Sequence, residues 1–360
     1  MFWTTRFGGD RFFQTPEEAC QTRLEAPESS PSPAWLGGAT AGSDIRWPGL
    51  HSQGLILSCQ ESGVVELWAE RGAPHLSESH DFRENSVCLT RLDLGEECPC
   101  PPFSWGNQIY IPGATSLTSF ELSSSPSLGK RLPLDELASP QHFAETPGGL
   151  LIWGERGVGL LSPDGFLEVL DPQFGCRQGS LLVNGASETL LYNPGKPATA
   201  WLFHHDGTVE ELDTSKLPEE VEYGIFAHSF VLIGGNSLAH LEASRFKRSE
   251  LPALVVAPPI YDKGEQRLTL LMNDSSARTC SSKGEKFSFL CDLAGAPSTP
   301  PLRLGEYLFY GIDGRYLCRN EEALRPRLSS PPLGSLSYAN GRVFGTCRDG
   351  SMFCFDLNQL

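Results

Sequence analysis

Apolar and β-favouring residues in this chain fall into short runs separated by turn-forming residues. The stretch GRVFGTCRDGSMFCFDL, residues 341–357, shows the pattern, with two such runs on either side of Asp349-Gly350. An Asp-Gly pair readily adopts the positive φ angles of a tight turn, and aromatic and β-branched flanks favour strands. The pattern predicts a β-hairpin, an element that is only marginally stable alone in water.

The same hairpin pattern recurs along the chain. The segment GEYLFYGIDGRYLCRN, 305–320, overlays 341–356 without gaps, and Asp313-Gly314 meets Asp349-Gly350 in that alignment. Further hairpin patterns occur at 54–68, 106–122, 159–171, 201–213 and 228–242. Their spacing of roughly 30 to 50 residues indicates a repeat architecture.

Short strands with one recurring hairpin per repeat leave three architectures: a β-propeller, a parallel β-helix and a pair of sandwiches. A parallel β-helix has shorter repeats, and two sandwiches do not explain a recurring Asp-Gly hairpin. Four strands with their turns fill roughly 40 to 45 residues of a propeller blade. The 360 residues therefore predict one all-β propeller domain, with seven blades favoured and six to eight compatible.

Closure of the predicted ring requires pairing of the N- and C-terminal strands, because an open sheet edge invites aggregation. We expect the N-terminal segment 1–50 to supply that strand, from residues 1–13 or 36–48. Within this segment, Thr15-Pro16 followed by 17–23 predicts one short helix. A single helical turn is expected at 135–138, and residues 251–300 fit the repeat badly.

The segments 305–320 and 341–357 resemble the repeat of quinoprotein-type propellers, the pyrroloquinoline-quinone-like repeat. They share its Gly-led strand, Asp-Gly turn, aromatic-rich strand and closing Asp. They are also similar to the tryptophan–aspartate repeat, although the Gly-His and Trp-Asp signatures are missing. Both resemblances imply a β-propeller. The first also raises a quinone-dependent dehydrogenase, but the tryptophan-rich motifs typical of those enzymes do not occur in this chain.

Charge and composition narrow the class of partner. The formal net charge is −16, which repels nucleic-acid phosphates and anionic membranes. No apolar run approaches the length of a membrane span, and the opening MFWTTRFGGDRFF has no apolar core of a secretory signal. Eleven scattered cysteines fit reduced thiols better than a disulfide framework. We therefore expect a cytoplasmic protein.

Candidate chemistry is sparse. Cys98-Pro99-Cys100 is one possible pair of metal ligands, but the chain has no second such pair. His204-His205 lies beside a predicted turn. The glycine-rich segment 154–159 lacks the following helix that a phosphate-binding loop needs. We expect no catalytic, cofactor-binding or metal-binding residue and no small-molecule substrate.

The sequence therefore favours a non-catalytic scaffold or adaptor that binds other protein subunits. Aromatic and basic side chains in loops are the candidate contacts, because such residues dominate binding hot spots. They are Phe103, Trp105, Arg245, Phe246, Lys247, Arg248, Arg325 and Arg327. The alternative is a propeller hydrolase, lyase or quinone-dependent dehydrogenase with its site at the mouth of the central channel.

Overall fold

In the residues that the computed structural model describes, all regular secondary structure is β-strand. The model describes residues 33–36, 45–52, 55–60, 62–70, 86–100, 102–105, 108–121, 127–171, 174–324, 327–328, 330–339, 342–349 and 352–356. Across these ranges no helix has the length and apolar character that crossing a membrane would need. The helix expected at 17–23 lies outside the described residues. The single turn expected at 135–138 is present, because the N–H groups of Leu137 and Ala138 both donate to the carbonyl of Leu134.

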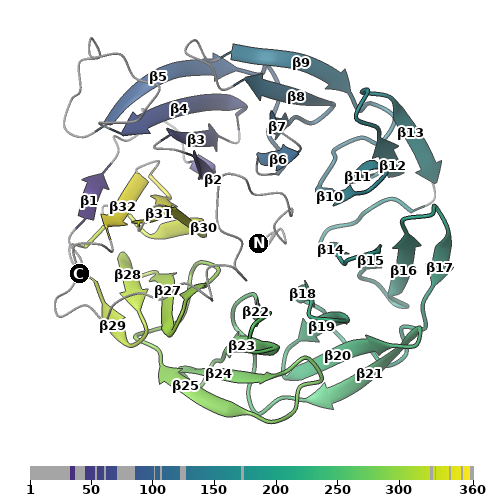
Figure 1. Cartoon of the computed structure of the whole chain (residues 1–360), viewed down its shortest axis with the longest axis vertical. Coiled ribbons are helices and arrows are strands. Elements are labelled where there is room, and N and C mark those ends of the chain that lie inside the picture. Colours follow the sequence, from purple (N-terminus) through teal and green to yellow (C-terminus); the bar gives the residue numbers. More distant parts are fainter. Residues whose placement is uncertain are drawn as a thin grey trace. The chain divides into compact units, whose positions relative to one another are not determined.

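The described strands form eight antiparallel sheets of four strands each (Figure 1). The sequence favoured seven repeats within a range of six to eight. The structure has the upper number, because residues 251–300, which fit the repeat badly, hold a complete sheet of their own. The chain divides into two compact units with four of these sheets in each.

The first unit includes Leu134–Ala296. The first strands of its successive sheets, β10, β14, β18 and β22, pack in that order. Its sheets are β10 (His142–Thr146), β11 (Gly149–Gly154), β12 (Gly157–Leu161) and β13 (Leu167–Asp171); β14 (Leu181–Asn184), β15 (Glu188–Asn193), β16 (Thr199–His204) and β17 (Val209–Glu211); β18 (Tyr223–Phe226), β19 (Phe230–Gly234), β20 (Ser237–Glu242) and β21 (Arg245–Glu250); and β22 (Ile260–Asp262), β23 (Arg267–Leu271), β24 (Ser276–Ser281) and β25 (Ser288–Asp292).

The second unit combines Gly9–Pro133 with Pro297–Leu360. Its sheets are β2 (Ile45–Ser52), β3 (Leu55–Gln60), β4 (Val64–Glu70) and β5 (Ser86–Asp93); β6 (Phe103–Trp105), β7 (Gln108–Pro112), β8 (Ser116–Glu121) and β9 (Ser127–Pro133); β26 (Leu302–Leu304), β27 (Tyr307–Ile312), β28 (Tyr316–Arg319) and β29 (Glu322–Ala323); and β30 (Pro332–Ala339), β31 (Arg342–Cys347) and β32 (Met352–Asp356) with β1 (Pro33–Leu36).

The final hairpin is completed by a strand from the N-terminal region, as the sequence predicted. β1 pairs antiparallel with β32, with Pro33 opposite Phe355 and Leu36 opposite Phe353. The pairing strand is Pro33–Leu36, which ends where the expected segment 36–48 begins. The later residues of that segment instead enter β2, the first strand of another sheet. The candidate strand at 1–13 lies outside the described residues.

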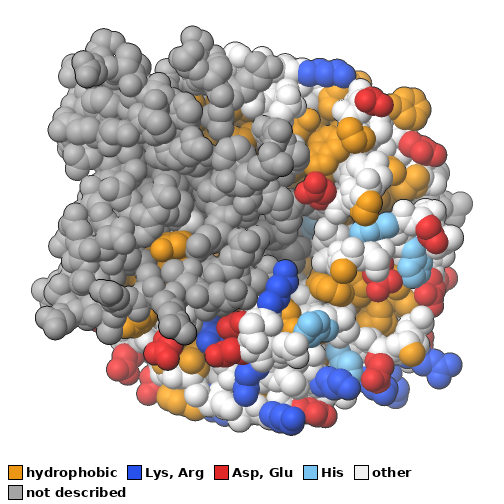
Figure 2. Space-filling model, in the orientation of Figure 1, with side chains coloured by type: hydrophobic (Ala, Val, Ile, Leu, Met, Phe, Trp, Pro, Cys, Tyr) orange, Lys and Arg blue, Asp and Glu red, His pale blue; other side chains and the backbone are white. Residues whose placement is uncertain are grey.

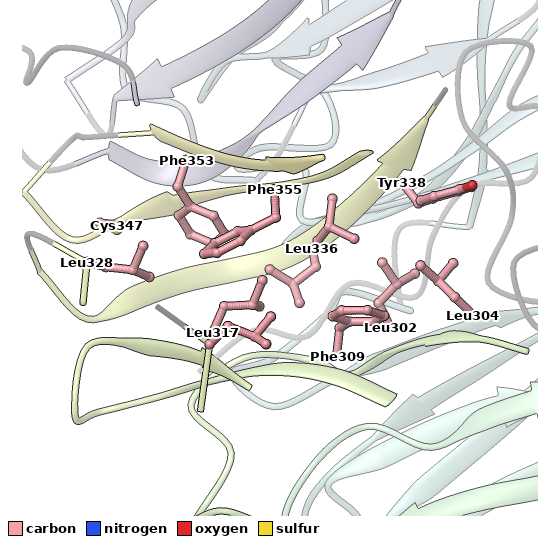
Figure 3. Packing of buried hydrophobic residues seen from close by; sticks show 12 residues of the cluster. Leu302, Leu304, Phe309, Leu317, Leu328, Leu336, Tyr338, Cys347, Phe353 and Phe355 are labelled. Atoms are coloured by element: carbon pink, nitrogen blue, oxygen red, sulfur yellow. The ribbon is translucent and has the colours of Figure 1, made fainter. Parts of the chain in front are cut away.

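Alternation along the strands explains how the last two repeats pack. Phe353 and Phe355, two residues apart on β32, point to the same side, and their ring centroids lie 6.0 Å apart. Both are fully buried, and Leu336 of β30 lies beside them (Figure 3). Leu317 and Phe309 from the preceding sheet complete the same core cluster. The hairpin that is marginal alone is therefore stabilised by burying its apolar face between two sheets.

A buried histidine at the start of β10 makes the first unit sensitive to acid. His142 is almost fully buried against the Trp153 ring, with a centroid distance of 5.5 Å, and its Nε2 finds no hydrogen-bond partner among the described residues. Burial lowers the pKa of His142 to about 4, from an ordinary value of about 6.5. The unfolded chain therefore takes up this proton first as the pH falls through 6.5.

We expect His142 to contribute stability that is complete above pH 6.5 and is lost progressively toward pH 4. The linkage relation gives a loss of about 2 kcal/mol in the free energy of unfolding between pH 7.5 and pH 5. Guanidinium unfolding at both pH values, for the wild type and His142→Gln, measures this loss. The variant should lose about 2 kcal/mol less than the wild type; an equal loss in both proteins would show that His142 does not titrate in this range.

Candidate protein-binding surface

The basic segment Arg245–Arg248 forms the start of β21, the outer strand of its sheet. Phe246 is 3% exposed and packs in the core with Leu232 and Ala239. The three cations, by contrast, are exposed. Phe246 therefore belongs to the interior, which corrects its selection as a surface contact, and its burial fixes the strand that displays Arg245, Lys247 and Arg248.

Carboxylates of the same sheet hold these cations in place. Lys247 forms an ion pair with Glu242, and the Arg248 Nε lies 3.2 Å from a Glu250 oxygen. Arg248 also donates through Nη2 to the Ser237 hydroxyl at 2.7 Å. The hydrogen bond and charge of Lys247 lower the pKa of Glu242, so this carboxylate stays ionised. Lys247 and Arg248 are thus preset in position while remaining open to solvent.

The hairpin between β24 and β25 brings two more cations to the same surface. Lys283 Nζ lies 3.7 Å from the second oxygen of Glu242. A Cβ added to Gly284 would lie 3.3 Å from that of Ser249, so the hairpin packs directly on β21. Lys286, also exposed, follows in the same turn. We call Arg245, Lys247, Arg248, Lys283 and Lys286 the basic surface.

The basic surface stands out against an acidic chain. Its five cations are accompanied by four carboxylates, Asp213, Glu242, Glu250 and Glu285, so its formal charge is +1 within a protein of net charge −16. In Figure 2, blue side chains gather along the lower right edge, over β21. Neither Lys283 nor Lys286 was identified from the sequence, because only the packing of one sheet's hairpin on the next brings them beside Arg245–Arg248.

The turn that leads into the basic strand is conformationally strained. Glu242 pairs with Arg245, which leaves a two-residue turn in which Ala243 and Ser244 have φ angles of 47° and 62°. Such turns favour Asn-Gly, because a Cβ makes the left-handed region costly. The double substitution Ala243→Asn, Ser244→Gly should raise the free energy of unfolding by about 1 kcal/mol. Chemical denaturation measures it, and a loss of stability would contradict the turn geometry.

The other predicted contacts lie elsewhere. Phe103 is 4% exposed in β6 and stacks on Tyr110, so it packs inside the second unit. Trp105 is half-buried, with its ring centroid 5.5 Å from that of Tyr110. Arg327 is exposed, and its guanidinium lies over the Tyr316 ring. Arg325 lies outside the described residues. Arg327 also lies beside Arg315, because its Nε donates to the carbonyl of Gly314 and the N–H of Leu328 donates to that of Arg315.

The possible metal hook lies in the interior. Cys98 and Cys100 are buried, and Cys59 of β3 hydrogen-bonds to Cys98. That hydrogen bond and burial raise the pKa of the Cys59 thiol. Within the ranges that the structure describes, no group of three or more His, Cys, Asp or Glu side chains is arranged to hold a metal ion.

The histidine pair lies at the start of the β16–β17 turn. The His204 Nδ1 lies 3.2 Å from Glu188, and its Nε2 lies 3.7 Å from Glu210, so this imidazole bridges two carboxylates of its own sheet. Burial lowers the pKa of the neighbouring His205. The arrangement is that of a partly solvated hairpin end.

Comparisons with known proteins establish the fold. No family model and no curated protein matches the chain. Among solved structures it is similar to the computationally designed Ika8 protein, with 11% identity over 88% of this chain and 98% of that one at a TM-score of 0.62. It is also similar to BamB from Moraxella catarrhalis, with 10% identity over 91% of this chain and 99% of that one at a TM-score of 0.59. Sqt1 from Saccharomyces cerevisiae is 12% identical over 91% of this chain and 99% of that one, at a TM-score of 0.65.

The chain has a β-propeller fold. Its four-stranded antiparallel sheets are the blades, and the all-β class predicted from the hairpin repeat is confirmed. Identities of 10% to 12% carry the fold alone, so the resemblance to the pyrroloquinoline-quinone-like repeat rather than to the tryptophan–aspartate repeat stays a prediction.

Proposed function

We propose that this β-propeller is a non-catalytic scaffold subunit of a cytosolic multi-protein complex, and that its basic surface binds an acidic segment of a partner protein. The observation that carries the proposal is the group of exposed cations on β21 and the adjoining hairpin, three of which are held by ion pairs. Surface loops and edges of a propeller vary without disturbing its core, and they are therefore where binding residues arise.

The reach of the basic surface follows from screening. At physiological ionic strength the Debye length is about 8 Å, so a partner's carboxylates within that distance experience mainly the nearby cations and not the distant charges of the chain. The net charge of −16 slows the approach of an acidic partner without preventing contact. Binding is therefore a short-range interaction that weakens as salt is added.

The internal ion pairs do not block this role. Surface salt bridges of the kind that Lys247 and Lys283 make with Glu242 contribute about 0 to 1 kcal/mol each. A partner carboxylate can replace or share such a pair at small cost. The pairs limit the side-chain freedom of the cations, which reduces the entropy that binding must overcome.

The proposed compartment agrees with the cysteine chemistry. None of the eight cysteines whose state the structure describes is in a disulfide, and seven of them are buried. Free thiols persist in a reducing compartment. Cytosolic residence is part of the proposal, and it rests on the same argument from reduced cysteines that the sequence supports.

Zero-length carbodiimide coupling tests the proposal, because it joins a lysine amine to a carboxylate only where the two are in contact. The tagged chain would be purified from its natural host, coupled and mapped by mass spectrometry. We expect a stoichiometric partner joined through its Asp or Glu residues to Lys247, Lys283 or Lys286. Lys196, which is exposed elsewhere in the same unit, serves as the internal control. A chain without a partner, or coupling confined to the control lysine, would overturn the proposal.

A further inference from the structure

A second exposed surface, of different chemistry, lies along β13. Phe166, in the turn that leads into this strand, is 70% exposed, and Leu170 within it is 37% exposed. The other exposed large apolar side chains among the described residues, Val209, Leu254 and Phe289, are dispersed over three further segments. Phe166 and Leu170 therefore place two exposed apolar side chains along the outer edge formed by β13 and the turn before it.

Four of the other outer strands carry features that protect a sheet edge from pairing; β25 has neither Lys nor Pro, but it directly follows a turn that contains Lys283 and Lys286. β9 contains Lys130, Arg131 and Pro133, and β21 contains the cations of the basic surface. β17 and β29 have only three and two residues. Lysine, proline and short length are the usual means by which proteins blunt an edge strand. β13 has none of these, and no Lys or Arg occurs from 157 to 176.

β13 is also the outermost strand of its sheet, and most of its pairing with β12 is regular. It is the last strand of the order β10-β11-β12-β13, and Leu167, Glu168 and Val169 pair in register with β12. The one irregularity falls at Leu170. In the described part of the chain, no hydrogen bond outside the sheets uses the backbone of 167–171. The outward backbone groups of this strand therefore have the geometry to pair with another strand.

The charges beside β13 indicate which partner segment could bind at its edge. Asp164 and Glu168 are exposed beside the apolar side chains. Figure 2 shows orange and red side chains next to each other on the upper right edge, over β13, without blue between them. An apolar residue of a partner would pack on Phe166 or Leu170, and a cation would pair with Asp164 or Glu168.

We infer that β13 is a second protein-binding site, which takes an extended partner segment of alternating apolar and basic residues as an added strand. Strand addition draws affinity from main-chain hydrogen bonds and specificity from alternate side chains. The site lies on a different sheet from the basic surface and prefers the opposite charge. Binding at β13 can therefore be tested independently of the proposed contact with an acidic segment.

The experiment uses the whole protein and a labelled synthetic peptide of alternating lysine and valine, with a glutamate–valine peptide as the charge control. Fluorescence anisotropy should show saturable binding of the lysine peptide and none of the glutamate peptide. Phe166→Lys should weaken binding at least about tenfold, because it removes an apolar contact and adds repulsion. The matched control Phe289→Lys, which changes an equally aromatic, 62% exposed residue of β25, should leave it unchanged.

Hydrogen exchange distinguishes strand addition from a loose ionic contact. The lysine peptide should protect amides of 167–171, and Leu170→Lys should reduce that protection as a second variant. The inference would be overturned if the lysine peptide failed to bind, or if Phe289→Lys weakened binding as much as Phe166→Lys. Protection of amides outside 167–171 would also overturn it. So would self-association of the wild-type chain that Phe166→Lys abolishes, because the occupant would then be a second copy.

Discussion

Replacement of Phe353 by Ala is expected to lower the free energy of unfolding by about 4 kcal/mol. The ring is fully buried, and it lies over Gly345, whose missing side chain leaves the space that the ring fills. Truncation removes apolar contacts with the Phe355 and Leu336 cluster and leaves a cavity that neighbouring strands fill only in part. Because Leu36 pairs with Phe353, the loss also loosens the attachment of β1.

Urea unfolding followed by circular dichroism measures this change. Phe289→Ala is the matched control, since it makes the same truncation at a 62% exposed position and should alter stability by less than about 0.5 kcal/mol. Limited proteolysis should release the residues before β2 faster in the Phe353 variant. Equal stability of the two variants would contradict the packing of the last two sheets.

Reversal of Arg245, Lys247 and Arg248 to Glu is expected to weaken the acidic partner's binding on the order of 100-fold. Each reversal removes an attraction and adds a repulsion, together worth about 1 kcal/mol for exposed charges, and three of them give roughly 3 kcal/mol. The side chains are exposed and Phe246 is retained, so the fold should survive. Quantitative co-purification with the tagged variant checks the loss.

The matched control reverses three other exposed cations of the same unit, Arg156, Arg177 and Lys196. It changes the net charge of the chain by the same amount. If the account is right, the control keeps its partner, while the basic-surface variant loses it. If both variants lose the partner to the same extent, total charge and not the basic surface governs binding.

The sequence was sufficient for the features that repeat or alternate. Asp-Gly turns with apolar flanks marked the last hairpins, and the need to cover the final edge predicted the pairing of an N-terminal strand. These inferences rest on local backbone geometry and on a rule that holds for every sheet edge. The position of the closing strand was less accurate, because Pro33–Leu36 carries little pattern within a Pro-rich stretch.

The candidate surface was only partly predictable. The sequence predicts Arg245, Lys247 and Arg248 as contacts because they lie close together in a basic run. The burial of Phe246 follows from its place in a strand, where the sequence predicts a loop. Lys283 and Lys286 reach this surface only through packing between sheets, which no local pattern reports. Likewise, the sequence alone does not distinguish the exposed Phe166 from a buried strand residue, because its exposure depends on its position at the outer edge of the sheet.

The most direct test of the central claim is the salt dependence of the dissociation constant for the co-purified partner, measured with the wild type and the basic-surface variant. We expect wild-type binding to weaken steeply between low and physiological salt. The variant should bind weakly throughout and lose most of that dependence, because the screened attraction is already absent. Parallel salt curves for the two proteins would show that the partner binds elsewhere on the molecule and would contradict the account.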